Sequence, residues 1–484
     1  MKKTLIIVIT IFLLFTGCKS SNDVLPDLTI RGDISQVIKL NDIWEELKTE
    51  KIEYNSEKIM AIKVQDLLNK IELLSSESEI YFKAVDRFTI KLTAKTMSNT
   101  YIGYSPTKKW VYISKKHPVN SGIKNISEMI IVNSSQEKNY EKGLNIIVAN
   151  KTIHYSTGQL LTMPYTVQNF SDGISRKEAD GAVYTVDVMQ QRKVLELTNF
   201  VKEPIKSTLV MDSQGEYEYI TCNGLVEVSD KGINYITQDK TYRDIVGIMV
   251  NPPQTTVMDC FNDSLHYLKQ NTDVMVLFID GFSYNQYLTI KDNKDLFIAN
   301  LQNVKKANTV FKPVTNAGFA AMITGEPPKV NGVLNRDYRE LKVATIFDKA
   351  SELNKKAILI EGNINILKTN LMPTLNIDLN NSGSNDDEIY NTALAEIDQG
   401  YNLFFVHFHS VDDYGHNYGD MNAKTLANIK LIDSYVKTLV EKWSGKVILV
   451  ADHGMHTTAD GGSHGEFRAE DLFIPYAVFE GGKN

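Results

Sequence analysis

The stretch Val274-Met275-Val276-Leu277-Phe278-Ile279-Asp280-Gly281 is an apolar run that ends in an aspartate and a glycine. A run that is apolar throughout is typical of a strand buried on both faces of a sheet. Similar runs recur at 356–360, 403–407, 447–450 and 474–479, with helical patterns such as 344–353 and 423–443 between them. This alternation predicts an α/β fold over residues 255–484, with a mostly parallel sheet and helices on both faces.

The N-terminal half has a different texture, with short runs rich in Val, Ile, Thr and Tyr between turn-forming residues. Such runs predict β-strands, and they occur at 29–33, 88–92, 110–113, 129–132 and 182–186. A helix is predicted at 64–74. The consecutive prolines of Asn251-Pro252-Pro253 block helix and ladder hydrogen bonds. They mark the predicted boundary between a β-rich region at 27–250, of one or two domains, and the α/β domain.

Three segments of the β-rich region resemble the molybdopterin-binding fold of sulfite-oxidase-like proteins. They are Leu28–Leu40, Val64-Gln65-Asp66-Leu67-Leu68 and Ala84-Val85-Asp86-Arg87-Phe88. That family holds molybdenum through a cysteine thiolate, and no cysteine lies between Lys19 and Thr221. The resemblance therefore implies a fold kept for binding or spacing without that metal.

The first residues predict an export signal, because Lys2 and Lys3 precede an apolar stretch from Leu5 to Phe15. This stretch is shorter than the ~20 apolar residues of a transmembrane helix. Leu14-Phe15-Thr16-Gly17-Cys18 resembles a bacterial lipobox, which implies cleavage before Cys18 and lipidation of its thiol. The alternative is an ordinary secretory signal. The lipoprotein interpretation makes 1–17 the signal peptide and 18–26 a polar tether, and it predicts a lipid-anchored protein on the extracytoplasmic face of the cell membrane.

The composition is that of a globular protein, with 43% hydrophobic residues. The 484 residues suffice for two or three domains of about 150 residues each. The formal net charge of −7 argues against non-specific binding of nucleic acid. Beyond Cys18 only Cys222 and Cys260 remain, which is too few for a disulfide scaffold, and neither is assigned a role.

Acidic side chains follow the predicted strands of the C-terminal half. Asp280 closes the first strand, Asp412 follows 403–407 after a short turn, and Asp452-His453 closes 447–450. Ligands gather at the carboxyl ends of strands in such sheets, so these groups are expected at one edge. A single aspartate at such a place is commonly a helix cap or a turn residue. Their joint occurrence favours a metal site.

Histidines supply the nitrogen ligands for such a site. Six of the nine lie between His407 and His464, and zinc accepts both Asp oxygen and His nitrogen. Asp412 and His416 are four residues apart. In a helical turn this spacing puts both side chains on one face, and in a tight loop they can also converge. The remaining candidates are Asp413, His407 and His409, interpreted as supporting or core groups, and His456, interpreted as a surface or supporting group.

Thr315 precedes Asn316-Ala317-Gly318 and a predicted helix at 319–323. The start of a helix offers free N–H groups and a positive potential to phosphate oxygens. A hydroxyl at this place, bound to a zinc ion, can lose its proton near neutral pH and attack phosphorus. The alternative is that Thr315 only caps the helix.

Residues 273–480 resemble the alkaline phosphatase superfamily, nearest the nucleotide pyrophosphatase/phosphodiesterase branch. The motifs that carry the resemblance are Asp280-Gly281-Phe282 with Tyr287-Leu288, Thr315 nine residues before Thr324-Gly325, Asp412-Asp413-Tyr414-Gly415-His416-Asn417-Tyr418-Gly419, Asp452-His453-Gly454-Met455 and Gly462-Ser463-His464-Gly465. The resemblance implies two zinc ions. One would be held by Asp280, Thr315, Asp452 and His453, the other by Asp412, His416 and His464.

The chain departs from that branch after the nucleophile, where Asn316-Ala317-Gly318 replaces the usual Phe-Pro-Asn. Downstream, Asn335 lies one place before the position of the branch's phosphate-contacting asparagine, and Arg336 occupies that position. Arginine forms bidentate pairs with phosphate oxygens, which favours a dianionic monoester over a diester. Arg336 is equally compatible with a surface position. The predicted substrate contacts are therefore backbone N–H groups near Asn316, together with Asn335 or Arg336.

These patterns predict a two-zinc phosphohydrolase that cleaves a diester, a pyrophosphate or a monoester through a phosphothreonine at Thr315. Other divalent metals fit the same ligands. One alternative is a surface binding or adhesion lipoprotein whose phosphatase-like domain is a non-catalytic scaffold. Another is a transferase that passes a phosphoryl or phosphoalcohol group to a surface glycan. The expected partners are a phosphoester substrate and, through the lipid on Cys18, the membrane.

Overall fold

The computed structural model describes residues 25–93, 99–114, 122–135 and 139–482. The predicted signal peptide, Cys18 and most of the predicted tether lie outside these residues. The chain divides into two compact units, Met1–Ser134 and Ser135–Asn484. Among the described residues, no helix has the length and apolar character needed to cross a membrane.

The first unit contains two sheets that share a hydrophobic cluster, which includes Phe82, Trp110 and Tyr112. One sheet has the order β2 (Ile38–Lys39), β1 (Thr29–Gly32), β9 (Ile126–Asn133), β5 (Ser78–Ala84), β6 (Thr89–Leu92). The other has the order β3 (Glu50–Tyr54), β4 (Glu57–Lys63), β7 (Thr100–Ser105), β8 (Lys109–Ser114). Two short helices are α1 (Leu40–Ile43) and α2 (Val64–Leu68). The helix predicted over 64–74 is thus wrong beyond Leu68, because Leu73 pairs with Ile34 in an isolated bridge.

The second unit begins with two antiparallel-rich sheets and α3 (Thr157–Thr162). The first sheet has the order β11 (Lys151–Tyr155), β10 (Leu144–Val148), β19 (Ile245–Val250), β14 (Thr208–Asp212), β15 (Tyr217–Ile220). The second has the order β12 (Thr166–Ala179), β13 (Ala182–Glu196), β16 (Leu225–Ser229), β17 (Gly232–Ile236), β18 (Thr241–Tyr242). The prediction of a β-rich region before residue 250 is therefore confirmed.

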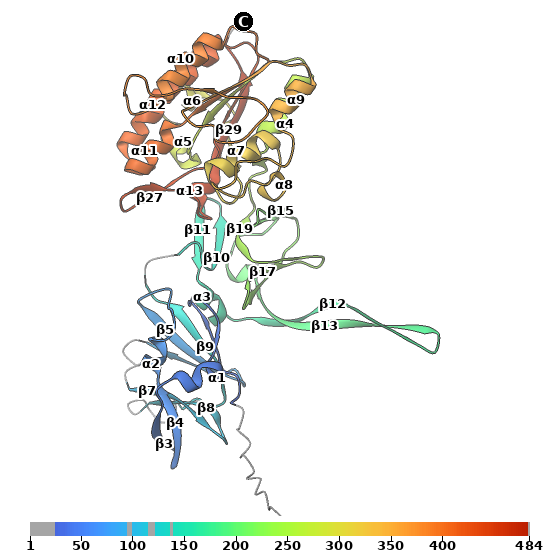
Figure 1. The fold of residues 1–484 in the computed structure, drawn as a ribbon, viewed down its shortest axis with the longest axis vertical. Helices are drawn as coiled ribbons and strands as arrows, with labels where there is room; N and C mark the ends of the chain where they lie inside the picture. The colour runs from blue at the N-terminus through green and yellow to red at the C-terminus, as the bar shows by residue number, and fades with distance from the viewer. Residues whose placement is uncertain (1–24, 94–98, 115–121, 136–138, 483–484) are drawn as a thin grey trace, which may run out of the picture. The chain divides into compact units, whose positions relative to one another are not determined.

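Strands β12 and β13 form a long ribbon that extends beyond β16 and β17 (Figure 1). Only Leu195 and Glu196, at its base, pair with β16. The predicted strand at 182–186 is one part of β13, which has 15 residues. Most side chains of the ribbon are exposed, including Val186 at 65%.

An eight-stranded sheet forms the C-terminal part of the second unit. Its order is β20 (Thr255–Thr256), β22 (Lys305–Asn308), β29 (Phe473–Glu480), β26 (Lys446–Val450), β21 (Val274–Ile279), β25 (Leu403–Phe408), β23 (Ala357–Glu361), β24 (Thr374–Leu375). Strand β29 is antiparallel to both of its neighbours, and the other pairings are parallel. Every residue of the central strands β21 and β25 is buried, as their apolar sequences predict.

Helices lie on both faces of this sheet (Figure 1). One group packs together from α4 (Asp259–Lys269), α7 (Thr315–Thr324), α8 (Pro328–Asn331) and α9 (Ile346–Glu352). The other group consists of α6 (Phe297–Asn300), α10 (Asp386–Glu396), α11 (Ser410–Tyr418) and α12 (Ala423–Lys442). Shorter elements between them are α5 (Tyr284–Ile290), α13 (Ala469–Leu472) and the hairpin of β27 (His456–Thr458) and β28 (Gly461–Ser463). The predicted α/β fold is confirmed.

The antiparallel-rich sheets and the α/β sheet belong to one compact unit. A hydrophobic cluster joins them, with Ile147, Leu209 and Met249 on one side and Phe467 and Leu472 on the other. The strand pattern changes between β19 and β20, where the sequence predicts a domain boundary at residues 250–255. That this is a boundary between domains stays a prediction.

Candidate metal and nucleophile site

The carboxyl ends of β21 and β26 bring two aspartates together. Asp280 follows β21 directly, and Asp452 lies two residues beyond β26. The two strands are neighbours in parallel register, with Phe278 opposite Val450. The Gly281 N–H donates to Asp452 Oδ1 at 3.2 Å. Both carboxylates are buried, as expected for groups at the edge of a sheet covered by helices.

His453 and Thr315 complete this first group of side chains. His453 Nε2 lies 3.2 Å from Asp452 Oδ2, 3.4 Å from Asp280 Oδ1 and 3.4 Å from Thr315 Oγ1. Thr315 is the first residue of α7, and Val314 occupies the N-cap position without a capping side chain. The Thr315 hydroxyl therefore faces the His453 ring, and capping does not account for it.

Helix α11 and the end of β28 supply the second group. Asp412 Oδ2 lies 3.3 Å from His416 Nε2, one turn further along α11. Asp412 Oδ1 lies 3.7 Å from the Nε2 atom of His464, which follows β28 directly. Of the two conformations considered for Asp412 and His416, the structure has the helical turn.

The two groups lie next to each other. Asp280, Asp412 and His453 each offer a ligand atom within 4.8 Å of the others, and the His453 and His464 rings stack with their centroids 3.8 Å apart. Gly281 permits this approach, because a Cβ atom there would lie 2.8 Å from Asp412 Oδ1 and its φ of +69° is strained for other residues. All seven predicted ligands thus meet at one place.

The hydrogen bonds of the imidazoles show which ring nitrogen carries a proton. His453 Nδ1 lies 2.9 Å from the Gly454 carbonyl, His416 Nδ1 3.1 Å from that of Gly462, and His464 Nδ1 2.8 Å from that of Pro313. A carbonyl oxygen only accepts, so each Nδ1 carries a proton. The Nε2 atoms of the three rings lie near the carboxylates, and that of His464 also accepts from Arg336 Nη2. Lone pairs that face carboxylate oxygens require a proton or a cation between them.

The carboxylates give the same indication. Asp280 Oδ1, Asp412 Oδ1 and Asp452 Oδ2 are buried without a hydrogen-bond partner, a costly state for charged oxygens. Burial and the nearby carboxylates of Asp280 and Asp412 raise the pKa of Asp452 well above its usual value. Burial, together with the His453 ring, lowers the pKa of His464 to about 3, so this ring stays neutral. The residues therefore fit divalent cations.

The predicted substrate contacts differ in position. Arg336 Nη2 lies 2.6 Å from His464 Nε2, so this exposed arginine reaches the site. The Asn316 side chain donates to the Tyr338 carbonyl at 3.0 Å, which holds the following loop against α7. The contact predicted through the backbone N–H groups near Asn316 stays a prediction. Asn335 Oδ1 accepts from the Asp337 N–H at 2.8 Å in a local turn. These two amides are engaged in loop structure and are not turned toward the ligands.

A layer of side chains behind Asp280 includes one residue that the sequence analysis missed. His407 and His409 approach Asp280 Oδ2 at 3.3 and 3.6 Å, in agreement with a supporting role. Glu361, at the end of β23, lies 3.4 Å from His407 Nδ1 and is fully buried. An acidic residue that closes an apolar strand, as Asp280 does, was the available signal. Asp413 is exposed.

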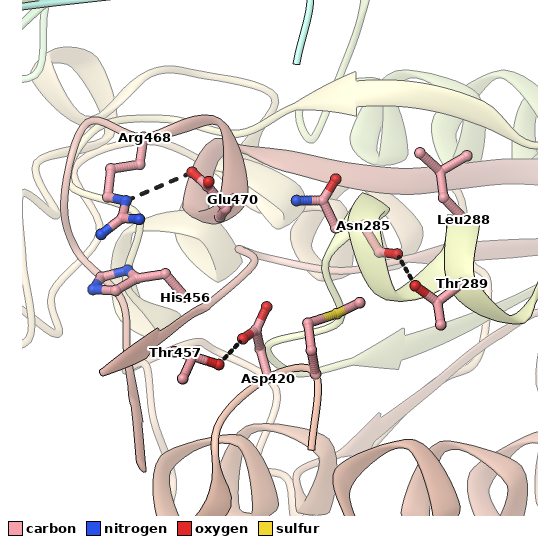
Figure 2. A pocket seen from close by; sticks show the side chains of 9 residues that line it. Asn285, Leu288, Thr289, Asp420, His456, Thr457, Arg468 and Glu470 are labelled. Carbon is pink, nitrogen blue, oxygen red and sulfur yellow. Dashed lines mark hydrogen bonds and ion pairs between the residues drawn. The ribbon is translucent and has the colours of Figure 1, made fainter. Parts of the chain in front are cut away.

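A separate cavity of about 540 Å³ lies beside α5 (Figure 2). Its lining residues are Asn285, Leu288, Thr289, Asp420, Met421, His456, Thr457, Arg468 and Glu470. His456 is not at the surface as one interpretation held, since it is 5% exposed and its Nδ1 lies 2.7 Å from Asp471 Oδ1. Arg468 turns toward Glu470 in the cavity wall, so its charge is compensated within the protein.

One protein-family model matches part of the C-terminal region. Residues 341–475 match the family model described as type I phosphodiesterase / nucleotide pyrophosphatase. This segment carries Asp412, His416, Asp452, His453 and His464, whereas Asp280 and Thr315 precede it.

The chain is also similar to part of GPI ethanolamine phosphate transferase 1. The identity is 35% over 95 residues for the protein of Emericella nidulans, which is 18% of this chain and 10% of that protein. For the protein of Saccharomyces cerevisiae it is 32% over 96 residues, again 18% and 10%. The chain thus spans about a tenth of the length of the curated relatives it matches.

Solved structures resemble the chain distantly. Murine ectonucleotide pyrophosphatase / phosphodiesterase 5 aligns with 39% of this chain and 58% of its own, at 18% identity and a TM-score of 0.32. Phosphonoacetate hydrolase from Sinorhizobium meliloti 1021, in complex with phosphonoformate, aligns with 38% and 56%, at 17% identity and a TM-score of 0.30.

Proposed function

We propose that this chain is a metal-dependent enzyme that acts on phosphoesters, with Thr315 as its nucleophile. The observation that carries the proposal is the position of the Thr315 hydroxyl, at the start of α7 and 3.4 Å from His453 Nε2, beside unpartnered carboxylate oxygens. The phosphodiesterase-type sequence of residues 341–475 supports it. Asp280, Thr315, Asp452 and His453 would hold one zinc ion, and Asp412, His416 and His464 the other.

The arrangement favours in-line displacement at phosphorus. Thr315 Oγ1 gives up its proton and forms a bond to phosphorus while the bond to the leaving oxygen breaks on the opposite side. The leaving oxygen takes up a proton, and the product on the protein is a phosphothreonine. The first N–H groups of α7 point out of the helix start and stabilise the equatorial oxygens. When bound, the cations supply Lewis-acid stabilisation of the negative charge on the attacking and leaving oxygens. A second nucleophile then attacks phosphorus, and Thr315 regains its proton.

The second nucleophile decides between two enzyme classes. Water makes the protein a phosphohydrolase, which is the function we propose. An alcohol acceptor makes it a transferase, and the similarity to GPI ethanolamine phosphate transferase 1 favours this second candidate. Product analysis in the presence of a sugar alcohol separates them, because only a transferase forms the phosphorylated acceptor faster than the product of hydrolysis. That product is free phosphate from a monoester and a phosphomonoester from a diester.

Metal analysis and a substrate panel test the proposal. The purified protein is expected to hold about two zinc ions per chain, as a two-metal site requires. It should cleave nitrophenyl monoesters, nitrophenyl diesters or nucleotides, and lose this activity with a chelator. Zinc should restore the activity after chelation. A chain without zinc and without turnover would instead support the scaffold alternative.

Arg336 provides a test of substrate charge. A monoester dianion gains more than a diester monoanion from a guanidinium, so Arg336→Ala should reduce kcat/KM for monoesters by about 10- to 100-fold and that for diesters less. Arg336→Lys should recover part of the loss, because lysine keeps the charge without the bidentate geometry. Arg339→Ala, an exposed arginine of the same loop, is the matched control. Equal losses of kcat/KM for monoesters and diesters would show that Arg336 does not discriminate between these two substrate classes.

A further inference from the structure

Two oxygens of one carboxylate have different surroundings in this site. Asp280 Oδ2 faces His407 Nε2 at 3.3 Å and His409 Nδ1 at 3.6 Å. Asp280 Oδ1 has no hydrogen-bond partner and points to His453 Nε2 at 3.4 Å. One oxygen is therefore anchored from behind, and the other is left open on the side of the proposed metal ligands.

The anchoring rings are held by groups that are not ligands. His407 Nδ1 lies 3.4 Å from Glu361 Oε1, and both side chains are fully buried. The His407 ring also stacks on Phe278, with the ring centroids 3.6 Å apart, which fixes its plane. The chain of contacts from Glu361 through His407 to Asp280 crosses three neighbouring strands, β23, β25 and β21.

His409 is oriented by the backbone. The Gly362 N–H donates to His409 Nε2 at 3.2 Å. Its other nitrogen, Nδ1, is therefore the one that carries a proton, and it lies toward Asp280 Oδ2. A nitrogen that carries a proton cannot bind a metal ion, so His409 acts as a hydrogen-bond donor to Asp280 and not as a ligand of a third cation.

We propose that Glu361 and His407 are positioning residues that hold the Asp280 carboxylate for metal binding. Partners of this kind fix the orientation of a ligand, and their loss typically weakens metal affinity by about 10- to 100-fold. The inference rests on the proposed function, because it requires the cluster to bind zinc.

The test measures zinc affinity of the full chain by competition with a chromophoric chelator. Glu361→Met removes the acceptor at similar volume and should weaken zinc binding by about 10- to 100-fold. Glu361→Gln keeps an oxygen that can accept from His407, so its affinity should stay close to that of the unchanged protein. His407→Phe, which retains the stacked ring, should weaken binding as Glu361→Met does. The double variant should bind no more weakly than His407→Phe, because the two residues act in series.

A structural role alone would give a different result. Asp433→Asn is the matched control, because Asp433 is also buried and accepts N–H groups from Phe297 and Ile298 outside the site. It should lower the unfolding temperature without changing zinc affinity. Unchanged zinc affinity in Glu361→Met and His407→Phe, or fully additive losses in the double variant, would overturn the proposal. If the protein without any substitution binds no zinc, the proposed function itself is contradicted.

Discussion

Thr315→Ala is expected to reduce turnover by about three orders of magnitude or more, because it removes the proposed nucleophile. Stability should change little, since Val314 occupies the N-cap position and the Thr315 side chain does not cap α7. Zinc content should fall only in part, because Asp280, Asp452 and His453 remain. Steady-state turnover of a nitrophenyl ester, together with metal analysis and thermal unfolding, measures all three quantities.

Thr315→Ser is the matched control, because serine keeps the hydroxyl at the start of the helix. It should retain measurable turnover. Acid quenching of the unchanged protein during turnover should trap a phosphoryl group on the peptide that contains Thr315, and Thr315→Ala should lack it. Turnover in Thr315→Ala close to that of the unchanged protein would remove the nucleophile assignment.

Gly318→Ala is expected to be the second most damaging change, against the usual trend for helices. A Cβ atom at Gly318 would lie 2.4 Å from the Asp452 carbonyl oxygen, and this backbone atom cannot turn away as a side chain does. In an ordinary helix the change stabilises by about 0.5–1 kcal/mol. Here overpacking should cost about 1–3 kcal/mol. The displaced helix start should lower kcat about 100-fold, since misplacement by ~1 Å has effects of that size.

Ala317→Gly separates this clash from helix propensity. At the neighbouring buried position it removes a methyl group, so it should cost about 1 kcal/mol with little loss of activity. Urea unfolding and turnover of both variants are the measurements. Higher stability and full activity of Gly318→Ala would show that α7 does not depend on its contact with Asp452.

The α/β sheet was predictable from sequence because its strands are buried on both faces. The predicted strand 274–279 is β21 itself, and the aspartates at the strand ends meet because parallel strands share one carboxyl edge. The sequence was therefore enough to predict that these seven side chains lie together. Their roles as ligands stay predictions.

The residues that were missed depend on contacts between strands. Glu361 meets His407 only because β23 pairs with β25 in the register that puts Ile360 opposite Val406, and the sequence of either strand does not contain that register. The prediction for Asn335 fails to account for a local contact. Its side chain accepts from the Asp337 N–H, two residues further on, and this hydrogen bond competes with any contact to substrate. His456 is buried with its Nδ1 atom 2.7 Å from Asp471 Oδ1, a contact that the local sequence around His456 does not reveal.

Strand β29 follows every other strand of the eight-stranded sheet in the chain, yet it lies between β22 and β26. Strand β29 pairs with β22 on one side and with β26 on the other. It therefore joins the segment that leads from β22 to Thr315 with the strands that precede the predicted ligands. During synthesis from the N-terminus, both halves of the sheet emerge before the strand that joins them. The proposed nucleophile and the proposed metal ligands are therefore expected to come together only after β29 has been made, so a chain that stops before Phe473 should lack the assembled site.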